Sequence, residues 1–284
     1  MKTSHFFLYL LLLVTGLFGY YEYKEQKTLS NQKPIPVITQ ITNSFLPSAK
    51  VDIKQEQITM FAVGDIMLGR SVNTRIQKQK DFTFPFQKIN KFFQGSDIVL
   101  VNLESPLGEN CPQTDTGMVF CADKNSVLGL KTMHATHANL ANNHINNQGI
   151  MGIDFTKNIL LQNQITPIGL STGSGVIISQ VKSAKIALLA FNDIPPYPKQ
   201  INNLNKELLV KQLEVATKSA DIVIVSFHWG NEYQLRSKRQ QEFAHLAVDN
   251  GADLIIGHHP HWVQETETYK NVPIFYSLGN GAKI

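Results

Sequence analysis

Short, largely apolar runs constrain the fold of this chain more than any other feature. Runs of this kind are typical of strands that are buried on both faces of a largely parallel sheet. A polar residue or a glycine follows each run at once and indicates where the predicted strand ends. The runs occupy residues 58–63, 97–101, 136–141, 221–227 and 253–256, and the third is the weakest.

The segments between these runs predict an α/β protein. Apolar residues recur at helical spacing in residues 150–163, 205–219 and 236–250. Residues 175–191 and 263–278 each contain two apolar stretches about a central turn, which predicts two antiparallel strand pairs. Strands that alternate with helices in this way indicate an α/β body with mixed sheets.

Residues that can bind a ligand follow the ends of the predicted strands. In open α/β sheets, ligands bind beyond the carboxyl ends of the strands, where side chains far apart in sequence share one pocket. We therefore predict one shared site at this edge of the body. Its candidate residues are Asp65, Asn102, Glu104, Asn143, His144, His228, His259 and His261.

Each candidate residue also has an interpretation without a function. Asp65 suits a turn, Glu104 suits a solvated loop, and residues 142–143 suit a helix cap. His228 suits a core histidine that is hydrogen-bonded. The coincidence that all of them follow strand ends favours the shared site. Two other histidines match no motif and are assigned no function: His134 and His137.

Carboxylate, amide and imidazole groups together form a donor set of intermediate hardness. Such a set suits Mn²⁺, Fe, Zn²⁺ or Mg²⁺, and the lack of thiolates argues against a structural zinc or an iron–sulfur cluster. His259 and His261 are separated by Pro260, so a turn after the strand would let both imidazoles reach one metal pair. The proline stiffens that turn. The donor set therefore predicts divalent metal binding.

Several sequence blocks coincide with these strand ends. They are GDIMLGR (64–70), VNLESPL (101–107), LANNHINNQGIMG (140–152), FHWGNEY (227–233), GADLIIGHHPHWVQ (251–264) and YSLGN (276–280). In order and spacing, the blocks resemble those of the CapA family of capsule-synthesis proteins, which are linked to poly-γ-glutamate. The resemblance covers the chain from about residue 57 to residue 280. An ordered set of blocks is far more specific than a single motif.

The resemblance implies the fold of calcineurin-like metallophosphatases, a four-layer α/β/β/α sandwich with two divalent metal ions at the strand ends. It implies that Asp65 binds metal from the first strand and that Glu104 or Asn102 occupies the bridging position. In the Asn-His pair, Asn143 would bind metal, and His144 would face the substrate as an acid or electrostatic clamp. The remaining implied metal ligands are His228, His259 and His261.

Two departures from the metallophosphatase pattern concern these ligands. The usual Asp-x-His of the first strand reads Asp-Ile-Met at residues 65–67, which removes one imidazole. The bridging aspartate is replaced by Asn-x-Glu at residues 102–104. We therefore expect one metal site to be weak or rebuilt. Family members continue beyond the YSLGN block, so the chain is expected to be a truncated member.

The N-terminal segment predicts a single membrane anchor. Residues 6–21 carry no charge, and at about 1.5 Å per residue they are slightly short for a bilayer core of about 30 Å. No small-x-small cleavage site follows, so an uncleaved signal anchor is favoured over a cleaved signal. We expect an anchor at 1–21, a polar linker at 22–56 and a metallophosphatase-like domain at 57–284.

The body is predicted to lie outside the cytoplasm, in an oxidising compartment. There, Cys111 and Cys121 are expected to form a disulfide that staples a surface loop, and a pair of thiols is the alternative. The net charge is +4, and the basic residues are scattered. This pattern argues against nucleic-acid binding and allows a weak attraction to an anionic polymer or a membrane.

Two functions are open on the sequence alone. The first is a metal-dependent hydrolase or transferase that acts on an anionic polymer, such as poly-γ-glutamate, or on a phosphate ester. The second is a non-catalytic accessory protein that binds or guides such a polymer together with other capsule-synthesis membrane proteins. The retained Asn-His and His-x-His patterns favour the first, and the missing first-strand histidine favours the second.

Overall fold

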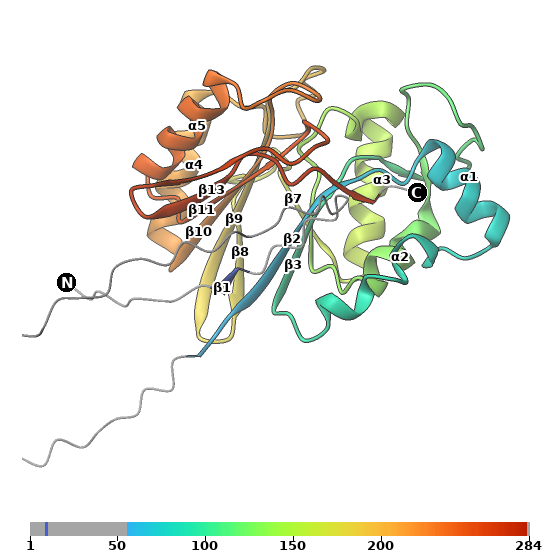
Figure 1. Ribbon diagram of the computed structural model, residues 1–284, viewed down its shortest axis with the longest axis horizontal. Helices are drawn as coiled ribbons and strands as arrows, with labels where there is room; N and C mark the ends of the chain where they lie inside the picture. The colour runs from blue at the N-terminus through green and yellow to red at the C-terminus, as the bar shows by residue number, and fades with distance from the viewer. Residues whose placement is uncertain (1–8, 11–55, 283–284) are drawn as a thin grey trace, which may run out of the picture. The chain divides into compact units, whose positions relative to one another are not determined.

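Two β-sheets that pack face to face form the centre of the body, and helices cover the outer face of each sheet (Figure 1). The computed structural model describes residues 9–10 and 56–282 of the chain. The layers follow the order helix, sheet, sheet, helix (Figure 1). The predicted four-layer α/β/β/α sandwich is therefore confirmed.

The first sheet is parallel throughout its described strands. It contains β1 (Tyr9–Leu10), β2 (Thr59–Ile66), β3 (Ile98–Leu103), β6 (His137–Asn139), β7 (Thr166–Ile168) and β14 (Asn280–Ala282). The strand order is β1-β2-β3-β6-β7, and β14 also pairs with β2. Parallel pairing brings the carboxyl ends of β2, β3 and β6 to one edge of the sheet.

The second sheet is parallel in its middle and antiparallel at both edges. It contains β8 (Ile177–Val181), β9 (Ala184–Asn192), β10 (Ile222–His228), β11 (Leu254–His258), β12 (Thr266–Tyr269) and β13 (Val272–Phe275). The order is β12-β13-β11-β10-β9-β8. The edge pairs β8–β9 and β12–β13 are antiparallel, which confirms both predicted strand pairs.

Helices on the two outer faces complete the layers. The first sheet is covered by α1 (Arg70–Gln79), α2 (Val127–Thr132) and α3 (Gly149–Gln162), and the second by α4 (Lys206–Ser219) and α5 (Lys238–Asp249) (Figure 1). The three predicted helices are confirmed as α3, α4 and α5. Short 3₁₀ turns lie at Phe84–Phe86, Asn90–Phe93, Lys124–Ser126 and Ile145–Gln148.

The continuous apolar runs are explained by cores on both sides of each central strand. Every residue of β10 is buried. Ile222 and Ile224 belong to a core that contains residues of both sheets, whereas Val223 and Val225 belong to the core under α4 and α5. Successive side chains of a strand point to opposite faces, so a strand between two cores must be apolar at every position.

Local hydrogen bonds set the starts of α4 and α5. The Asn205 side chain accepts a hydrogen bond from the backbone nitrogen of Leu208 at the start of α4. At α5, Ser237 Oγ accepts from Gln240 N over 3.2 Å, and the Gln240 side chain accepts from Ser237 N over 2.8 Å. This reciprocal capping box satisfies backbone donors that a helix leaves unpaired at its first turn.

The third predicted strand ends earlier than its sequence suggested. The apolar run was predicted as a strand over 136–141, but β6 covers only His137–Asn139. The side-chain oxygen of Asn139 accepts a hydrogen bond from Ala141 N over 2.8 Å, which bends the backbone out of the sheet. Asn142 and Asn143 therefore lie in the turn after the strand.

A disulfide-closed loop connects the two strands of a short ribbon next to α1. The ribbon pairs β4 (Leu107–Gly108) with β5 (Ala122–Asp123), and Cys111 and Cys121 are bonded between them. The predicted disulfide is confirmed. Two side chains of α1 hold the loop, since Asn73 donates to the carbonyl of Pro112 and Thr74 to that of Thr114.

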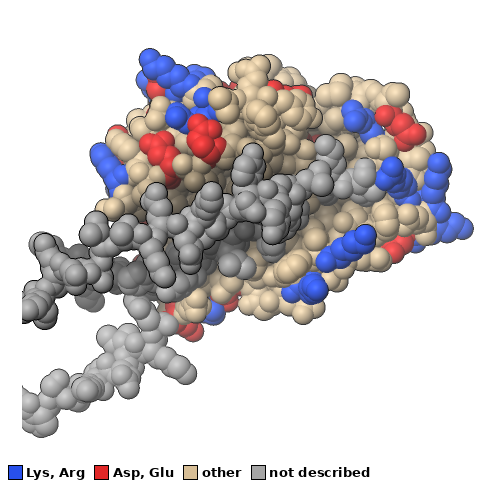
Figure 2. All heavy atoms as spheres, in the orientation of Figure 1, with Lys and Arg blue, Asp and Glu red and all other residues tan. Residues whose placement is uncertain are grey.

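Charged residues are dispersed over the face of the molecule that Figure 2 shows. Lys and Arg side chains lie among Asp and Glu side chains there, and the described residues form no continuous basic patch on that face.

Most of the predicted anchor and linker lies outside the described residues. Of the anchor at 6–21, only the two residues of β1 are described, and they pair with Thr59 and Met60 at the start of β2. Of the linker at 22–56, only Glu56 is described. In the part of the chain that the structure describes, no helix is both long enough and apolar enough to span a bilayer.

Candidate metal centre

Asp65 lies at the end of β2, where the backbone departs from regular pairing. The register between β2 and β3 shifts between Val63 and Asp65. Gly64 permits a close approach of the last strand, because a Cβ at this position would lie 2.1 Å from the carbonyl oxygen of Gly279. The carboxylate of Asp65 is 1% exposed and accepts hydrogen bonds from Asn102 Nδ2 over 2.7 Å and from His259 N over 3.1 Å.

Two neighbouring imidazoles stabilise the ionised form of Asp65. His261 Nδ1 lies 3.0 Å from Oδ2, and His258 Nδ1 lies 3.6 Å from Oδ1. Burial raises the pKa of Asp65, but the adjacent His258 and His261 outweigh it and hold that pKa well below its usual value. The carboxylate is thus ionised at neutral pH.

A chain of buried amides connects the two sheets beneath the site. Asn102, near the end of β3, accepts a hydrogen bond from Asn139 Nδ2 over 3.0 Å and donates to Asp65. Asn139 also donates to Ser226 Oγ of β10 over 3.3 Å. Both ends of the Asn102 amide are engaged by protein groups. This arrangement favours Glu104 over Asn102 at the bridging position, which the sequence had left open between them.

Glu104 is a buried carboxylate without a hydrogen-bond partner among the described residues. Its side chain is 1% exposed, and neither oxygen is hydrogen-bonded. His228 Nε2 lies 3.5 Å and His261 Nε2 lies 3.8 Å from Glu104 Oε1. Burial raises the pKa of Glu104 well above its usual value, and repulsion by Asp65 and Glu232 adds to the shift. The alternative of a solvated loop charge is therefore wrong.

His228 and Asn143 face each other from opposite sheets. His228 ends β10 and is fully buried, and its Nε2 lies 2.8 Å from Asn143 Oδ1. Its Nδ1 lies 3.3 Å from Asn102 Nδ2. Burial and the neighbouring imidazoles lower the pKa of His228 well below its usual value. The ring is thus neutral at neutral pH, the state in which an imidazole binds metal.

His259 and His261 lie on the turn that follows β11. Both have left-handed backbone conformations, with φ of 95° and 60°. Such conformations are uncommon outside glycine and are often found at functional sites. The turn is held in place because Tyr233 N donates to the carbonyl of Pro260 and Asn280 Nδ2 donates to that of His261.

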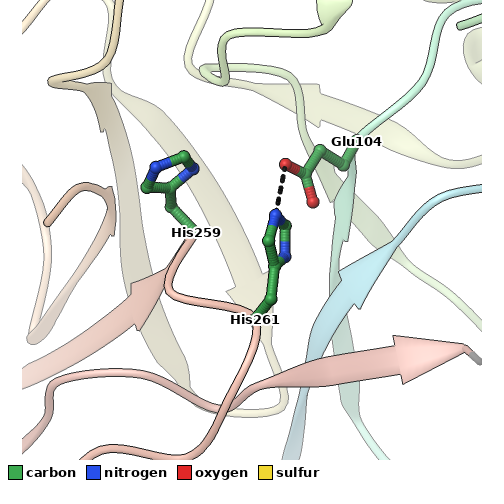
Figure 3. A group of neighbouring side chains, drawn as sticks. All are labelled: Glu104, His259 and His261. Atoms are coloured by element: carbon green, nitrogen blue, oxygen red, sulfur yellow. Dashed lines mark ion pairs between the residues drawn. The ribbon is translucent and has the colours of Figure 1, made fainter. Parts of the chain in front are cut away.

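Glu104, His259 and His261 form a compact donor cluster at the junction of the sheets (Figure 3). One ligand atom from each of the three lies within 4.8 Å of the others. Burial lowers the pKa of His259 to about 4, whereas Asp65 raises the pKa of His261 against the effect of burial. The two Glu104 oxygens and His259 Nδ1 are buried and have no hydrogen-bond partner among the described residues. Unpaired donors of this kind, oriented towards one point, fit a divalent cation.

His144 stands beside this cluster and lines an adjacent pocket. Its ring stacks on Phe120 at a centroid distance of 4.1 Å, and its Nδ1 lies 3.0 Å from Asn147 Oδ1. Burial lowers the pKa of His144, so the ring is neutral at neutral pH. The pocket has a volume of about 350 Å³ and is also lined by Glu104, His261 and Arg70.

The structure brings the predicted strand ends together and adds residues that the sequence did not single out. The predicted site residues all lie at the predicted edge: Asp65, Asn102, Glu104, Asn143, His144, His228, His259 and His261. Met67, which replaces the histidine of the metallophosphatase pattern, lines the pocket. His258 was missed, although it is fully buried and neither ring nitrogen has a hydrogen-bond partner among the described residues. Its position at the end of an apolar run was the available signal.

The histidines that were assigned no function lie away from the cluster. His134 is exposed. His137 is buried in β6, where its Nε2 lies 2.8 Å from Ser179 Oγ of β8 and joins the two sheets. Asn139 was missed because the strand was predicted to end two residues later than it does. Arg70, Phe120 and Glu232 were missed because nothing in their spacing connects them to the strand ends.

Comparison with known proteins identifies a family for most of the described body. Residues 59–283 match the family of bacterial capsule synthesis protein PGA_cap. The PGA biosynthesis protein CapA of Bacillus subtilis (strain 168) is 33% identical over 281 residues, which are 90% of this chain and 74% of that protein. The capsule biosynthesis protein CapA of Bacillus anthracis is 32% identical over 248 residues, which are 80% of this chain and 60% of that protein.

Solved structures with low sequence identity share the fold. A crystal structure of a novel phosphatase from Mycoplasma pneumoniae superposes with a TM-score of 0.52 at 16% identity. The match covers 78% of this chain and 71% of that phosphatase. This likeness concerns the α/β sandwich and agrees with the metallophosphatase-like arrangement of layers.

Proposed function

The chain belongs to the bacterial capsule synthesis protein family PGA_cap, and from this membership we propose that it is an anchored envelope protein with a metal-dependent phosphoesterase-like site. Its task would be the synthesis or export of a capsule polymer such as poly-γ-glutamate. One observation carries the catalytic part of the proposal. Glu104 presents a buried carboxylate to His259 and His261 at the end of a parallel sheet, and this carboxylate has no hydrogen-bond partner in the part of the chain that the structure describes.

The donor groups divide naturally between two divalent ions. The first ion would be bound by the donor cluster: Glu104, His259 and His261. Further ligands would come from both sheets: Asp65, Asn143 and His228. A metal bound here would act as a Lewis acid and lower the pKa of a bound water. The metal is expected to be Mn, Fe, Zn or Mg, because the donors are oxygen and imidazole nitrogen.

The residues around the cluster can position a substrate and move a proton. His144 is held by Asn147 at Nδ1 and by Phe120 at its face, and it is neutral at neutral pH. A neutral imidazole beside the pocket can accept a proton and return it to a leaving group. The pocket is large enough for a small anionic group or the end of a polymer chain.

A non-catalytic role is the second candidate, and Met67 favours it. This thioether stands where metallophosphatases carry an imidazole ligand, so one ion would have fewer donors. A site with one weak ion could bind an anionic polymer without hydrolysing it. Metal-dependent turnover of a phosphodiester by the purified protein would separate the two candidates.

The location of the body is part of the proposal. The uncharged run at 6–21 supports an anchor, and the Cys111–Cys121 disulfide supports an oxidising compartment outside the cytoplasm. Fractionation of cells that express a C-terminally tagged chain tests the anchor. Recovery of a shortened and freely soluble form would contradict it. Other membrane proteins of capsule synthesis are the expected partners.

The test of the metal site is elemental analysis of the purified chain, combined with thermal melts with and without chelator. We expect divalent metal in the wild type and a sharp loss in His261→Ala and Asp65→Ala, because each removes a ligand. His134→Ala is the matched control, since His134 is exposed and lies outside the cluster. A wild type without divalent metal, or an equal effect of His134→Ala, would refute the site.

A further inference from the structure

The pocket beside the donor cluster has a single cationic side chain of fixed charge in its lining. Arg70 is the only Lys or Arg among the described residues that line it, and it faces the same space as Glu104, His144 and His261. Arg70 opens helix α1 and has a left-handed backbone conformation, with φ of 50°. A non-glycine residue in this conformation is uncommon and often lies at a binding site.

The guanidinium of Arg70 is held in place but lacks an acidic partner. Nη1 donates to the carbonyl of Gly117 over 3.2 Å, and Cζ lies 5.4 Å from the ring centroid of Phe120. Nε is buried without a hydrogen-bond partner, and no carboxylate of the described residues forms an ion pair with Arg70. A guanidinium fixed in this way retains donors for a planar or tetrahedral oxyanion.

The disulfide loop supplies the contacts that fix Arg70. Gly117 and Phe120 both lie between Cys111 and Cys121, so the bond restrains the segment that carries them. Phe120 also stacks on His144, and its backbone nitrogen donates to Asn147 Oδ1. The cation and the candidate acid–base residue are therefore positioned by one aromatic ring.

We propose that Arg70 binds an oxyanion of the substrate, a carboxylate or a phosphate, next to the donor cluster. This inference rests on the proposed function and adds to it the substrate class. The substrate carries a negative group adjacent to the one that reaches the cluster. Glu104 and Glu232 also line the pocket and repel anions, so Arg70 fixes where the second negative group can lie.

The test uses the full chain, purified in detergent, and isothermal titration calorimetry with two probes. Inorganic phosphate represents the phosphate source and glutarate the carboxylate source. The wild type is expected to bind at least one probe, and the tighter one identifies the source. Arg70→Gln should raise the dissociation constant of that probe by about 10-fold to 100-fold, because a hydrogen bond to a charged group is lost. Arg70→Lys keeps the positive charge but lacks the planar fork of guanidinium donors. Its affinity should lie between those of the wild type and Arg70→Gln.

Two controls separate this inference from the proposed function. Arg75→Gln removes an exposed cation from the same helix and should bind both probes like the wild type. Metal content is measured on every variant and should not change in Arg70→Gln. Titrations in the presence of chelator show whether Arg70 binds anions even where the metal proposal fails.

Three results would overturn the inference. The first is a wild type that binds neither probe. The second is an Arg70→Gln variant that binds both probes as tightly as the wild type. The third is an equal loss in Arg75→Gln, which would reveal a general effect of charge. If Arg70→Gln does not fold, as judged by its thermal melt, Arg70→Lys is the decisive variant, and binding as tight as in the wild type overturns the role of the Arg70 guanidinium in the contact.

Discussion

Glu104 occupies an environment that disfavours its negative charge, and a proton or a bound cation would relieve it. Its carboxylate is buried, lacks hydrogen-bond partners among the described residues, and lies near the ionised Asp65. A carboxyl group whose pKa is raised by folding binds more protons in the folded state. The stability that it contributes is therefore complete below its ordinary pKa of about 4.5 and falls as pH rises above that value.

Replacing Glu104 by glutamine should uncouple stability from metal binding. Glu104→Gln removes the buried charge, so without metal the free energy of unfolding at pH 7 should rise by about 1–2 kcal/mol. Metal content should drop sharply. Urea unfolding with chelator and elemental analysis measure the two effects. Glu242→Gln removes an exposed carboxylate and should change neither. A Glu104→Gln variant that is less stable without metal would contradict this account.

His137 gives the body a sensitivity to acid that is independent of the metal cluster. Burial lowers its pKa from 6.5 to about 4. The unfolded chain binds the proton more tightly, so stability rises with pH between 4 and 6.5 and is lost as pH falls through that window. The shift corresponds to about 3 kcal/mol.

A His137→Gln variant tests this contribution. Urea unfolding of the wild type at pH 7 and pH 4 should show a loss about 3 kcal/mol larger than the loss in the variant. The other histidines titrate in both proteins and cancel in the difference. His134→Gln, at an exposed position, should retain the full wild-type loss. Equal losses in the wild type and in His137→Gln would show that His137 does not titrate as described.

At the scale of single residues, the sequence predicts a candidate ligand only where an apolar run indicates the end of a strand. Asp65, His228 and His259 come after clear apolar runs, so their common edge was predictable. Asn139 was not, because its own side chain ends the strand through a local hydrogen bond. His258 was not predicted, because His259 and His261 already match the His-x-His pattern.

At the scale of elements, apolar periodicity separated the predicted helices from the missed ones. α3, α4 and α5 have apolar stripes of more than three turns, and their bounds matched the predictions closely. α1 buries Asn73 and Thr74 beside Val72 and Ile76, so half of its inner face is polar. Those polar residues bind the disulfide loop, a contact that no periodic pattern encodes.

The disulfide that closes the loop should contribute to the stability of the body. A Cys111→Ser/Cys121→Ser variant loses a cross-link over a sequence separation of 10, which corresponds to about 2–3 kcal/mol of unfolding free energy in the chain-entropy account. Urea unfolding measures the loss. Reductant should destabilise the wild type to the level of the variant and leave the variant unchanged. Alkylation of both thiols in unreduced wild type would contradict the bond.

At the scale of the whole molecule, the donor cluster belongs to neither sheet alone. Asp65 and Glu104 lie at strand ends of the first sheet, whereas His228, His259 and His261 lie at strand ends of the second. The order of layers was predictable from the family resemblance, and the pairing of the two edges was not predictable from periodicity. The contacts between these strand-end residues therefore form only when the two sheets pack against each other.

The contact between Asp65 and His261 joins residues that are 196 positions apart. Contacts of such separation form late in folding, because closing a long loop costs entropy before the contact is made. A metal that binds only the completed cluster would therefore leave the refolding rate almost unchanged and slow unfolding. At a concentration of about ten times its dissociation constant, we expect unfolding about tenfold slower, as measured by stopped-flow fluorescence. The ion would then act as a clasp that sets the lifetime of the folded body, whether or not a substrate is turned over.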